Sequence, residues 1–307
     1  MGATPNIGSM RLFSKYTKCL LAVVALLLLS NSQLSAQTAL QQSAGERGFS
    51  AMNWWLPDDA LLGFVKVPSG SFPMGSNPLI DPMAFENERW SSARRQGIVD
   101  VPLFYVSRFE STVAQFRAFV ESTSYNADPQ SLEGGVSDPV SYVTWTDAVA
   151  YARWLDQQLR TNENTPDELK QFMNEGGRVS LASEAQWEKA AKGSEGLIYP
   201  WGNQLVDNKA NYSSSGKRPV GSLDCSECYL GLADMSGNVW EWTKSPYDDY
   251  PFDPSDDRMN LADDALWVMR GGSYSDDANN IRASVRGAAD PGARRPFIGF
   301  RVVISKD

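Results

Sequence analysis

The stretch between Gly231 and Thr243, which reads GLADMSGNVWEWT, carries residues whose types and spacing could do chemistry. Two carboxylates, Asp234 and Glu241, stand on either side of a Gly237-Asn238 turn. Carboxylate and backbone carbonyl oxygens gathered in one loop are the ligands that a hard cation such as Ca²⁺ prefers, although the spacing differs from that of an EF-hand. These residues alone leave two interpretations open: a calcium loop, or a core strand that is entered through a turn.

Two tryptophans, Trp240 and Trp242, flank Glu241. Because alternate residues of a strand share one face, we expect both indoles on one side and the carboxylate on the other. We further expect the two indoles to form the floor beneath the segment that follows Ser273.

The composition excludes several classes of site. None of the 307 residues is histidine. This excludes Ser-His-Asp and Cys-His catalysis, zinc held by histidine and the two-histidine, one-carboxylate iron site. Lys and Arg number 28 against 37 Asp and Glu, a net charge of −9, which argues against nucleic acid as a partner. A small molecule, a peptide or another protein is the expected ligand.

Residues 1–36 have the pattern of a secretory signal peptide. A basic region with Arg11, Lys15 and Lys18 precedes an apolar run from Cys19 to Leu29, and Leu34-Ser-Ala36 is a suitable cleavage site. The apolar run is shorter than the ~20 residues of a membrane-spanning helix, so no span is expected after cleavage. No cysteine stands at the cleavage point to carry a lipid anchor. We expect a secreted or periplasmic protein whose mature chain has 25 basic and 37 acidic residues.

Two of the three cysteines, Cys225 and Cys228, lie beyond the signal peptide. In an oxidising compartment a Cys-x-x-Cys pair is most simply a disulfide that closes a small loop. A redox-active pair and a zinc site remain as alternatives. The first lacks the βαβ pattern of thioredoxin-like motifs, and the second lacks two further ligands.

The remaining pattern predicts a lead-in at 37–61 and one domain at 62–305. Capping boxes at Thr112 and Ser183 predict helix starts, and a further helix is expected over Asp147–Leu159. The Pro-Ser-Gly cluster after Phe64 predicts a hairpin turn, and Ile298–Ile304 predicts a single terminal strand. Residues 161–176 are polar and predict a surface loop.

Seven short motifs in this order resemble the formylglycine-generating enzyme, or sulfatase-modifying-factor, superfamily. Over some 240 residues they are Val65–Ser76, Pro139–Trp145, Leu181–Glu188, Tyr199–Asn203, Asp234–Trp242, Arg270–Tyr274 and Gly299–Arg301. The resemblance implies an α+β fold, a variant of the C-type-lectin-like fold. It is loop-rich, with about three helices around short twisted sheets and with bound calcium.

The resemblance also implies calcium ligands. One site would use Asp234, Glu241 and the carbonyls of Gly237 and Val239. A second, which the family begins at the positions of Asn211 and Tyr212, lacks its completing aspartate here. We therefore expect one structural calcium ion.

In the family, two cysteines shortly after the Arg-Gly-Gly-Ser motif hold the copper ion that oxidises a substrate cysteine to formylglycine. Here Asp276 stands at the first position, the second falls near Ile281, and the segment from Ser273 to Arg282 has no cysteine. A soft copper(I) site cannot form from these side chains. The resemblance therefore predicts that this chain does not make formylglycine by the copper route.

The same segment supplies the candidate catalytic and pocket residues. Two adjacent carboxylates suit acid–base catalysis or a hard metal, and a solvated turn is the alternative. The arginines could instead be buried partners of carboxylates such as Glu241. The candidates are Ser273, Asp276, Asp277, Arg282 and Arg286 for catalysis, with Trp240 and Asn279 in the pocket.

Three functions remain open. The first is an exported oxidase or modifying enzyme of a divergent branch, similar to periplasmic proteins that mature a siderophore chromophore. The second is a non-catalytic binding or scaffold module on a C-type-lectin-like fold. The third is an accessory protein of sulfatase activation.

Overall fold

A computed structural model of the chain describes residues 59–91, 96–261 and 265–306. These residues belong to one unit that spans 51–307. The predicted signal peptide at 1–36 and residues 37–58 of the predicted lead-in lie outside the described residues. No helix within the described ranges has the length and apolar character needed to cross a membrane.

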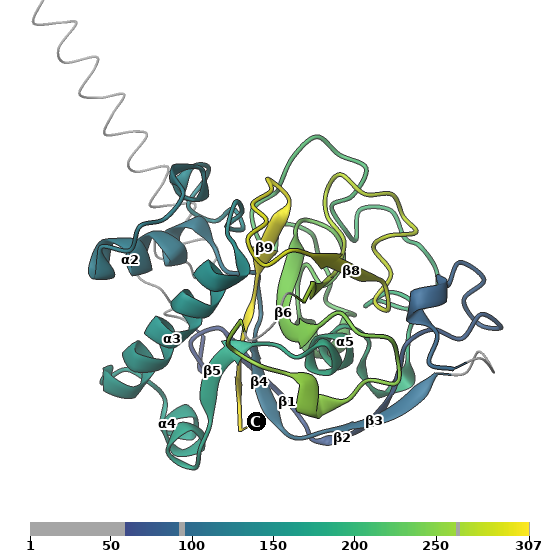
Figure 1. The fold of residues 1–307 in the computed structure, drawn as a ribbon, viewed down its shortest axis with the longest axis horizontal. Helices are drawn as coiled ribbons and strands as arrows, with labels where there is room; N and C mark the ends of the chain where they lie inside the picture. The colour runs from purple at the N-terminus through teal and green to yellow at the C-terminus, as the bar shows by residue number, and fades with distance from the viewer. Residues whose placement is uncertain (1–58, 92–95, 262–264, 307) are drawn as a thin grey trace, which may run out of the picture. The chain divides into compact units, whose positions relative to one another are not determined.

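The first sheet has four antiparallel strands in the order β1-β4-β10-β5. Helices α2, α3 and α4 lie on one side of β4 and β10, and α5 with β6 lies on the other (Figure 1). The strands are β1 (Phe64–Val67), β4 (Phe104–Ser107), β5 (Arg178–Leu181) and β10 (Val302–Ser305).

Strands β2 (Gly70–Met74) and β3 (Gly97–Val101) form a separate antiparallel pair. The hairpin turn that we predicted after β1 is therefore wrong, because β1 pairs with β4 and β2 with β3. Both pairs keep one register, with Val67 opposite Phe104 and Gly70 opposite Val101. Pro68 and Pro102 lie at the break. Proline has no N–H to donate to a strand ladder. The ladder of one long hairpin is therefore interrupted there and forms two strand pairs, β1 with β4 and β2 with β3.

Three helices begin at capping boxes. Helix α2 (Val113–Thr123) is capped by Thr112 and α5 (Glu184–Lys192) by Ser183, as predicted. Helix α3 (Trp145–Thr161) begins two residues before its predicted start, since Thr144 and Asp147 form a third capping box.

The surface loop predicted at 161–176 is instead largely helix α4 (Asp167–Asn174). Its buried residues Leu169, Phe172 and Met173 have the spacing of one helical face, which polar neighbours mask in the sequence. The described residues thus hold four α-helices where about three were expected. Single 3₁₀ turns occur at Glu86–Glu88, Pro129–Leu132, Gly193–Glu195, Tyr229–Gly231 and Pro254–Asp256.

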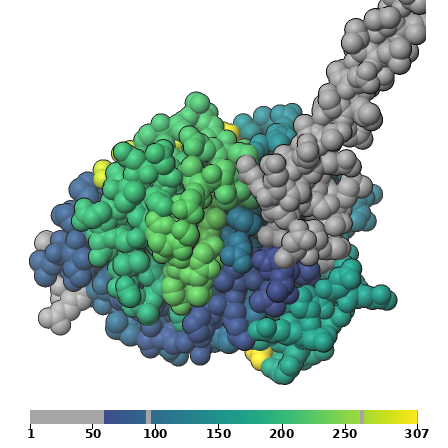
Figure 2. Space-filling view, turned by 180° about the vertical axis from the view of Figure 1, so that it is seen from behind, coloured from purple at the N-terminus to yellow at the C-terminus, as the bar shows by residue number. Residues whose placement is uncertain are grey.

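The third sheet has the order β8-β7-β6-β9. Strand β6 pairs antiparallel with β7 and parallel with β9, and β7 pairs antiparallel with β8. The strands are β6 (Trp240–Pro246), β7 (Trp267–Arg270), β8 (Arg286–Ala289) and β9 (Ile298–Phe300). The irregular connection that precedes β6 covers much of the face in Figure 2, where residues near 200–240 are green.

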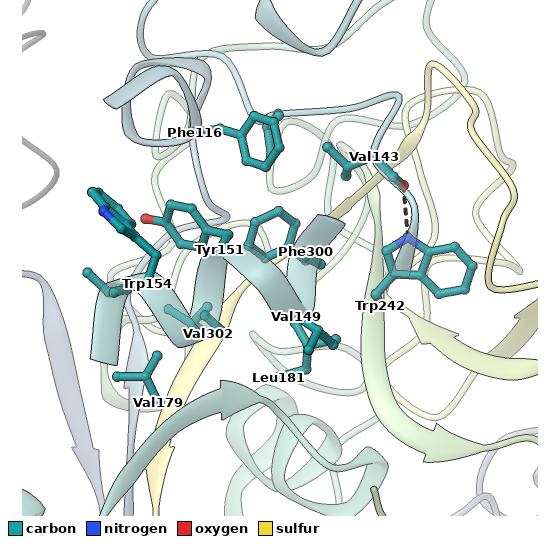
Figure 3. Packing of buried hydrophobic residues seen from close by; sticks show 14 of the residues in the cluster. Phe116, Val143, Val149, Tyr151, Trp154, Val179, Leu181, Trp242, Phe300 and Val302 are labelled. Atoms are coloured by element: carbon teal, nitrogen blue, oxygen red, sulfur yellow. Dashed lines mark hydrogen bonds between the residues drawn. The ribbon is translucent and has the colours of Figure 1, made fainter. Parts of the chain in front are cut away.

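The main core packs α2 and α3 against the first and third sheets. Phe116, Tyr151 and Phe300 contact one another, with ring centroids 5.2 to 6.4 Å apart (Figure 3). Trp242 lies in this core, where its Nε1 donates to the carbonyl of Val143 at 3.1 Å. Trp242 therefore does not form the floor that we predicted beneath the Ser273 segment.

The predicted single strand 298–304 is divided between two sheets, as β9 and β10. Arg301 lies at the division and turns its side chain to Glu241. Its Nε donates to Oε2 at 2.6 Å and its Nη2 to Oε1 at 2.7 Å. Trp187 Nε1 also donates to Glu241 Oε2 at 2.6 Å, and both charged side chains are almost fully buried. One ion pair thus joins β6, α5 and the β9–β10 junction.

We expect Arg301→Ala to lower the free energy of unfolding by about 3–5 kcal/mol, because it leaves the buried carboxylate of Glu241 without its cation. Urea unfolding followed by circular dichroism measures the loss. The control is Arg178→Ala on β5, whose side chain is 69% exposed. Its partner Asp156 keeps its pair with Arg160, so removing this exposed cation should cost less than about 1 kcal/mol. Equal small losses for the two variants would contradict the assigned role of Arg301.

Candidate functional site

The segment from Ser273 to Arg286 leaves β7 through two glycines. Gly271 and Gly272 have φ of 98° and 73°, in the left-handed region that glycine adopts most easily. A Cβ on Gly272 would lie 2.5 Å from the carbonyl oxygen of Asn280, so the turn closes tightly on the segment it introduces. This turn brings Ser273 over β6.

Ser273, Asp276 and Trp240 form a hydrogen-bonded cluster. Asp276 Oδ2 accepts from Ser273 N at 2.9 Å, from Ser273 Oγ at 2.6 Å and from Trp240 Nε1 at 2.9 Å. No donor among the described residues reaches the other oxygen, Oδ1. The structure therefore brings together three of the predicted site residues and leaves one carboxylate oxygen available. We call these three residues the Asp276 cluster.

The two candidate arginines do not join the Asp276 cluster. Arg282 pairs with Asp81 at 2.5 Å and with Glu88 at 2.7 Å, and all three side chains are buried. Arg286 pairs with Glu184 through two bonds of 2.6 and 2.9 Å. Both cations are thus engaged in buried ion pairs, which is the alternative that the sequence left open, although their partners are not Glu241.

Asp277 and Asn279 lie on an exposed turn beside the cluster. Asp277 Oδ1 accepts from Asn279 N at 2.9 Å and from Asn280 Nδ2 at 3.2 Å. The backbone carbonyl of Asn279 in turn accepts from Arg282 Nε at 2.9 Å. These contacts organise the turn. Asp277 is therefore part of a solvated turn, which was the alternative to a catalytic role.

Two tyrosines that the sequence did not single out lie beside this segment. Tyr274 follows Ser273, and burial raises the pKa of its phenol, with a further contribution from nearby Tyr142. Tyr142 has a φ of 58°, which is strained for a bulky residue. Its amide donates to Arg295 O at 3.0 Å and its carbonyl accepts from Arg294. Positive φ is a property of the folded backbone, so no sequence signal identified Tyr142.

Two buried carboxylates, Glu110 and Glu241, and the half-buried Asp234 surround the Gly-Asn turn that we predicted as a calcium loop. Glu110 accepts from Asn238 Nδ2 at 2.6 Å and from Val239 N at 3.1 Å. Burial, and then the carboxylates of Asp234 and Glu241, raise the pKa of Glu110 well above its ordinary value, while Arg301 opposes the shift. Glu110 was not among the predicted site residues.

The predicted calcium ligands are engaged with other groups. Both oxygens of Glu241 accept from Arg301, and Asp234 Oδ2 accepts from Gly221 N at 2.6 Å. Within the described residues, no three His, Cys, Asp or Glu side chains are grouped so as to hold a metal ion. The predicted site combines two carboxylates with two backbone carbonyls, and calcium stays a prediction.

The weaker second calcium site is also held by protein contacts. Asn211 Oδ1 accepts from Ser214 Oγ at 2.7 Å, and Asn211 Nδ2 donates to Asn238 Oδ1 at 3.0 Å. Asn211 O accepts from Asn238 N at 2.8 Å, and Tyr212 is partly exposed beside it. These bonds tie the Asn211 loop to the Gly-Asn turn, and the second site stays a prediction.

Cys225 and Cys228 form the predicted disulfide. Asp224 precedes the loop that it closes and Glu227 lies within it, and both pair with Lys209, at 3.5 and 2.6 Å. The disulfide lies outside the Asp276 cluster, so these sulfurs do not supply the missing copper ligands there.

The family model of the sulfatase-modifying factor enzyme 1-like domain matches residues 57–306. The chain belongs to this family. It is 34% identical over 80% of its length to the serine/threonine-protein kinase Pkn1 of Chlamydia trachomatis. It is 27% identical over 78% of its length to the hercynine oxygenase of Mycolicibacterium smegmatis. These matches span 38% and 60% of the two relatives, respectively.

A solved structure shows the same fold. PvdO from Pseudomonas aeruginosa superposes with a TM-score of 0.63 at 24% identity, covering 79% of this chain and 94% of that one. The predicted loop-rich α+β architecture of the formylglycine-generating enzyme family is confirmed.

The predicted calcium site requires EDTA to lower the melting temperature and added Ca²⁺ to restore it, because a bound ion stabilises only the folded chain. Differential scanning calorimetry measures the midpoint. Glu241→Gln should destabilise the protein with and without EDTA, since it breaks the pair with Arg301 whether or not calcium binds. An unchanged wild-type midpoint in EDTA would eliminate the calcium site.

Proposed function

We propose that this protein is an exported modifying enzyme of a divergent branch of the family, which acts at the Asp276 cluster. It does not make formylglycine by the copper route. Family membership and the fold support the general class of activity, and the N-terminal sequence supports export. The siderophore-maturation-like oxidase predicted from the sequence is the specific form of this proposal.

The observation that carries the proposal is the arrangement of Asp276. This residue stands where the resemblance predicts the first copper cysteine. Three donors hold its Oδ2, so the carboxylate has a fixed orientation. A carboxylate fixed in this way can accept a proton from a substrate O–H or N–H at Oδ1, as a general base. Trp240 is buried in the core, so its indole holds Asp276 in place from below.

A second candidate is a non-catalytic binding module. It is favoured by the hydrogen bonds of Ser273, whose Oγ donates to Asp276 and is 3.0 Å from Ser275 Oγ. These groups carry no redox function, and under this proposal the Oδ1 of Asp276 is the atom that contacts a polar ligand. The residues from Ser273 to Arg286 contain neither cysteine nor histidine. A substitution at Asp276 that abolishes ligand binding, in a protein that forms no product to begin with, would identify this function.

We expect Asp276→Asn to lower product formation by about 10²–10⁴-fold, because the amide cannot accept the substrate proton. The assay incubates purified protein in air with a small-molecule and peptide extract of the producing cells. Untargeted mass spectrometry then compares the products. The matched control is Asp277→Asn, which removes the same charge one residue away on the exposed turn. Equal activity of the two variants would remove Asp276 from the mechanism.

We expect no formylglycine from a sulfatase-derived cysteine peptide, and no stoichiometric Cu(I) complex at the Asp276 cluster. Carboxylate and indole groups are poor ligands for this soft ion. Competition with a colorimetric Cu(I) chelator measures the affinity. A tight complex that is lost on Cys225→Ser would overturn the exclusion of copper, since it would show that this thiol pair binds the ion.

A further inference from the structure

One cleft is built from elements that the proposed function does not use. It has a volume of about 410 Å³ and lies between the segment that follows Phe85 and the loop that follows β6. Its lining residues are Glu86, Asn87, Arg89, Trp90, Ser91, Asp249 and Tyr250. The cleft shares no residue with the Asp276 cluster, so an inference about it is independent of the proposed enzyme activity.

The loop that follows β6 alternates aromatic and acidic residues, as YDDYPFDPSDD over 247–257. Two of its carboxylates are used within the loop region: Asp253 caps Ser255, and Asp257 accepts from Ser245. Asp248 and Asp249 are exposed, and no donor or cation within the described ranges contacts their side chains. Of these free carboxylates, Asp249 lines the cleft.

Two aromatic rings form the wall of the cleft. The ring centroids of Trp90 and Tyr250 are 5.0 Å apart, with an angle of 36° between the planes. Trp90 lies flat over Gly97, where an added Cβ would be 2.0 Å from the indole. Both rings are thus held in place, and Gly97 is required for the position of Trp90.

Tyr250 already contacts one cation. The guanidinium of Arg286 lies 4.1 Å from the centre of its ring, in a cation–π contact. Because Glu184 neutralises that guanidinium through two bonds, it adds little positive charge to the cleft. Arg89 pairs with Glu86 through a single contact at the surface. Among the described lining residues, Asp249 is the charge without a partner.

We propose that this cleft binds an organic cation: the primary ammonium group of a flexible alkyl chain, as in a lysine side chain or a free polyamine. The indole of Trp90 is the aromatic surface that such a group prefers, and Asp249 supplies the counter-charge. The cleft is larger than a single ion needs and accommodates the methylene chain against the two rings. The net charge of −9 attracts cations to the protein as a whole.

Isothermal titration calorimetry at low ionic strength tests the proposal with two probes, spermidine and a tetralysine peptide. Binding of spermidine alone identifies a free polyamine, and stronger binding of tetralysine identifies a basic polypeptide. The neutral analogue, tetra-acetyl-lysine peptide, should give no heat. We expect Asp249→Asn and Trp90→Phe each to weaken binding at least about fivefold, because each removes one of the two attractions.

The matched control is Asp207→Asn, which removes the same charge from an exposed position outside the cleft. We expect it to change the affinity by less than about twofold, since salt screens distant surface charges. Equal weakening by Asp207→Asn would show a response to bulk charge and overturn the proposal. Binding of the acetylated peptide, or an unchanged affinity in Trp90→Phe with an unchanged melting temperature, would overturn it as well.

Discussion

The structure depends on the buried ion pair between Glu241 and Arg301. Arg301 separates β9 from β10, so it lies where the chain leaves the third sheet and enters the first. Glu241 is on β6 and also accepts from Trp187 of α5. Burying two charges carries a large desolvation cost, and the pair is stable only because its geometry and hydrogen bonds are nearly complete. This requirement restricts how the two sheets and α5 can be arranged.

Further buried ion pairs hold the parts that have little regular structure. Glu188 of α5 pairs with Arg270 and Lys192, both at 2.5 Å, and Arg282 and Arg286 attach the segment after β7 to carboxylates of distant segments. Such pairs contribute little net stability compared with apolar replacements, but removing one partner is costly. We infer that these ion pairs fix the positions of the loops. In regular parts of a protein, backbone hydrogen bonds between strands would do so.

This network explains why the candidate site differs from the prediction. The arginines of the Ser273–Arg286 segment are required for the fold, which leaves Asp276 with Ser273 and Trp240 as the polar centre. Asp276, which the resemblance places at the first copper-cysteine position, is here a carboxylate of fixed orientation. The function proposed above therefore rests on Asp276, whose Oδ2 is held by Ser273 and Trp240.

The sequence alone determined the family and the fold class, and it located the helix starts at Thr112 and Ser183, because capping boxes and ordered motifs are local signals. It also identified the Cys225–Cys228 pair and the loss of the copper cysteines. Only the tertiary structure decided the partners of Arg282, Arg286 and Arg301, because each pairs with carboxylates 60 or more residues away. The division of the first hairpin at Pro68 and of the terminal strand at Arg301 was decided there too. The apolar run at 298–304 does not predict that its two halves join different sheets, because strand pairing depends on partners distant in the chain.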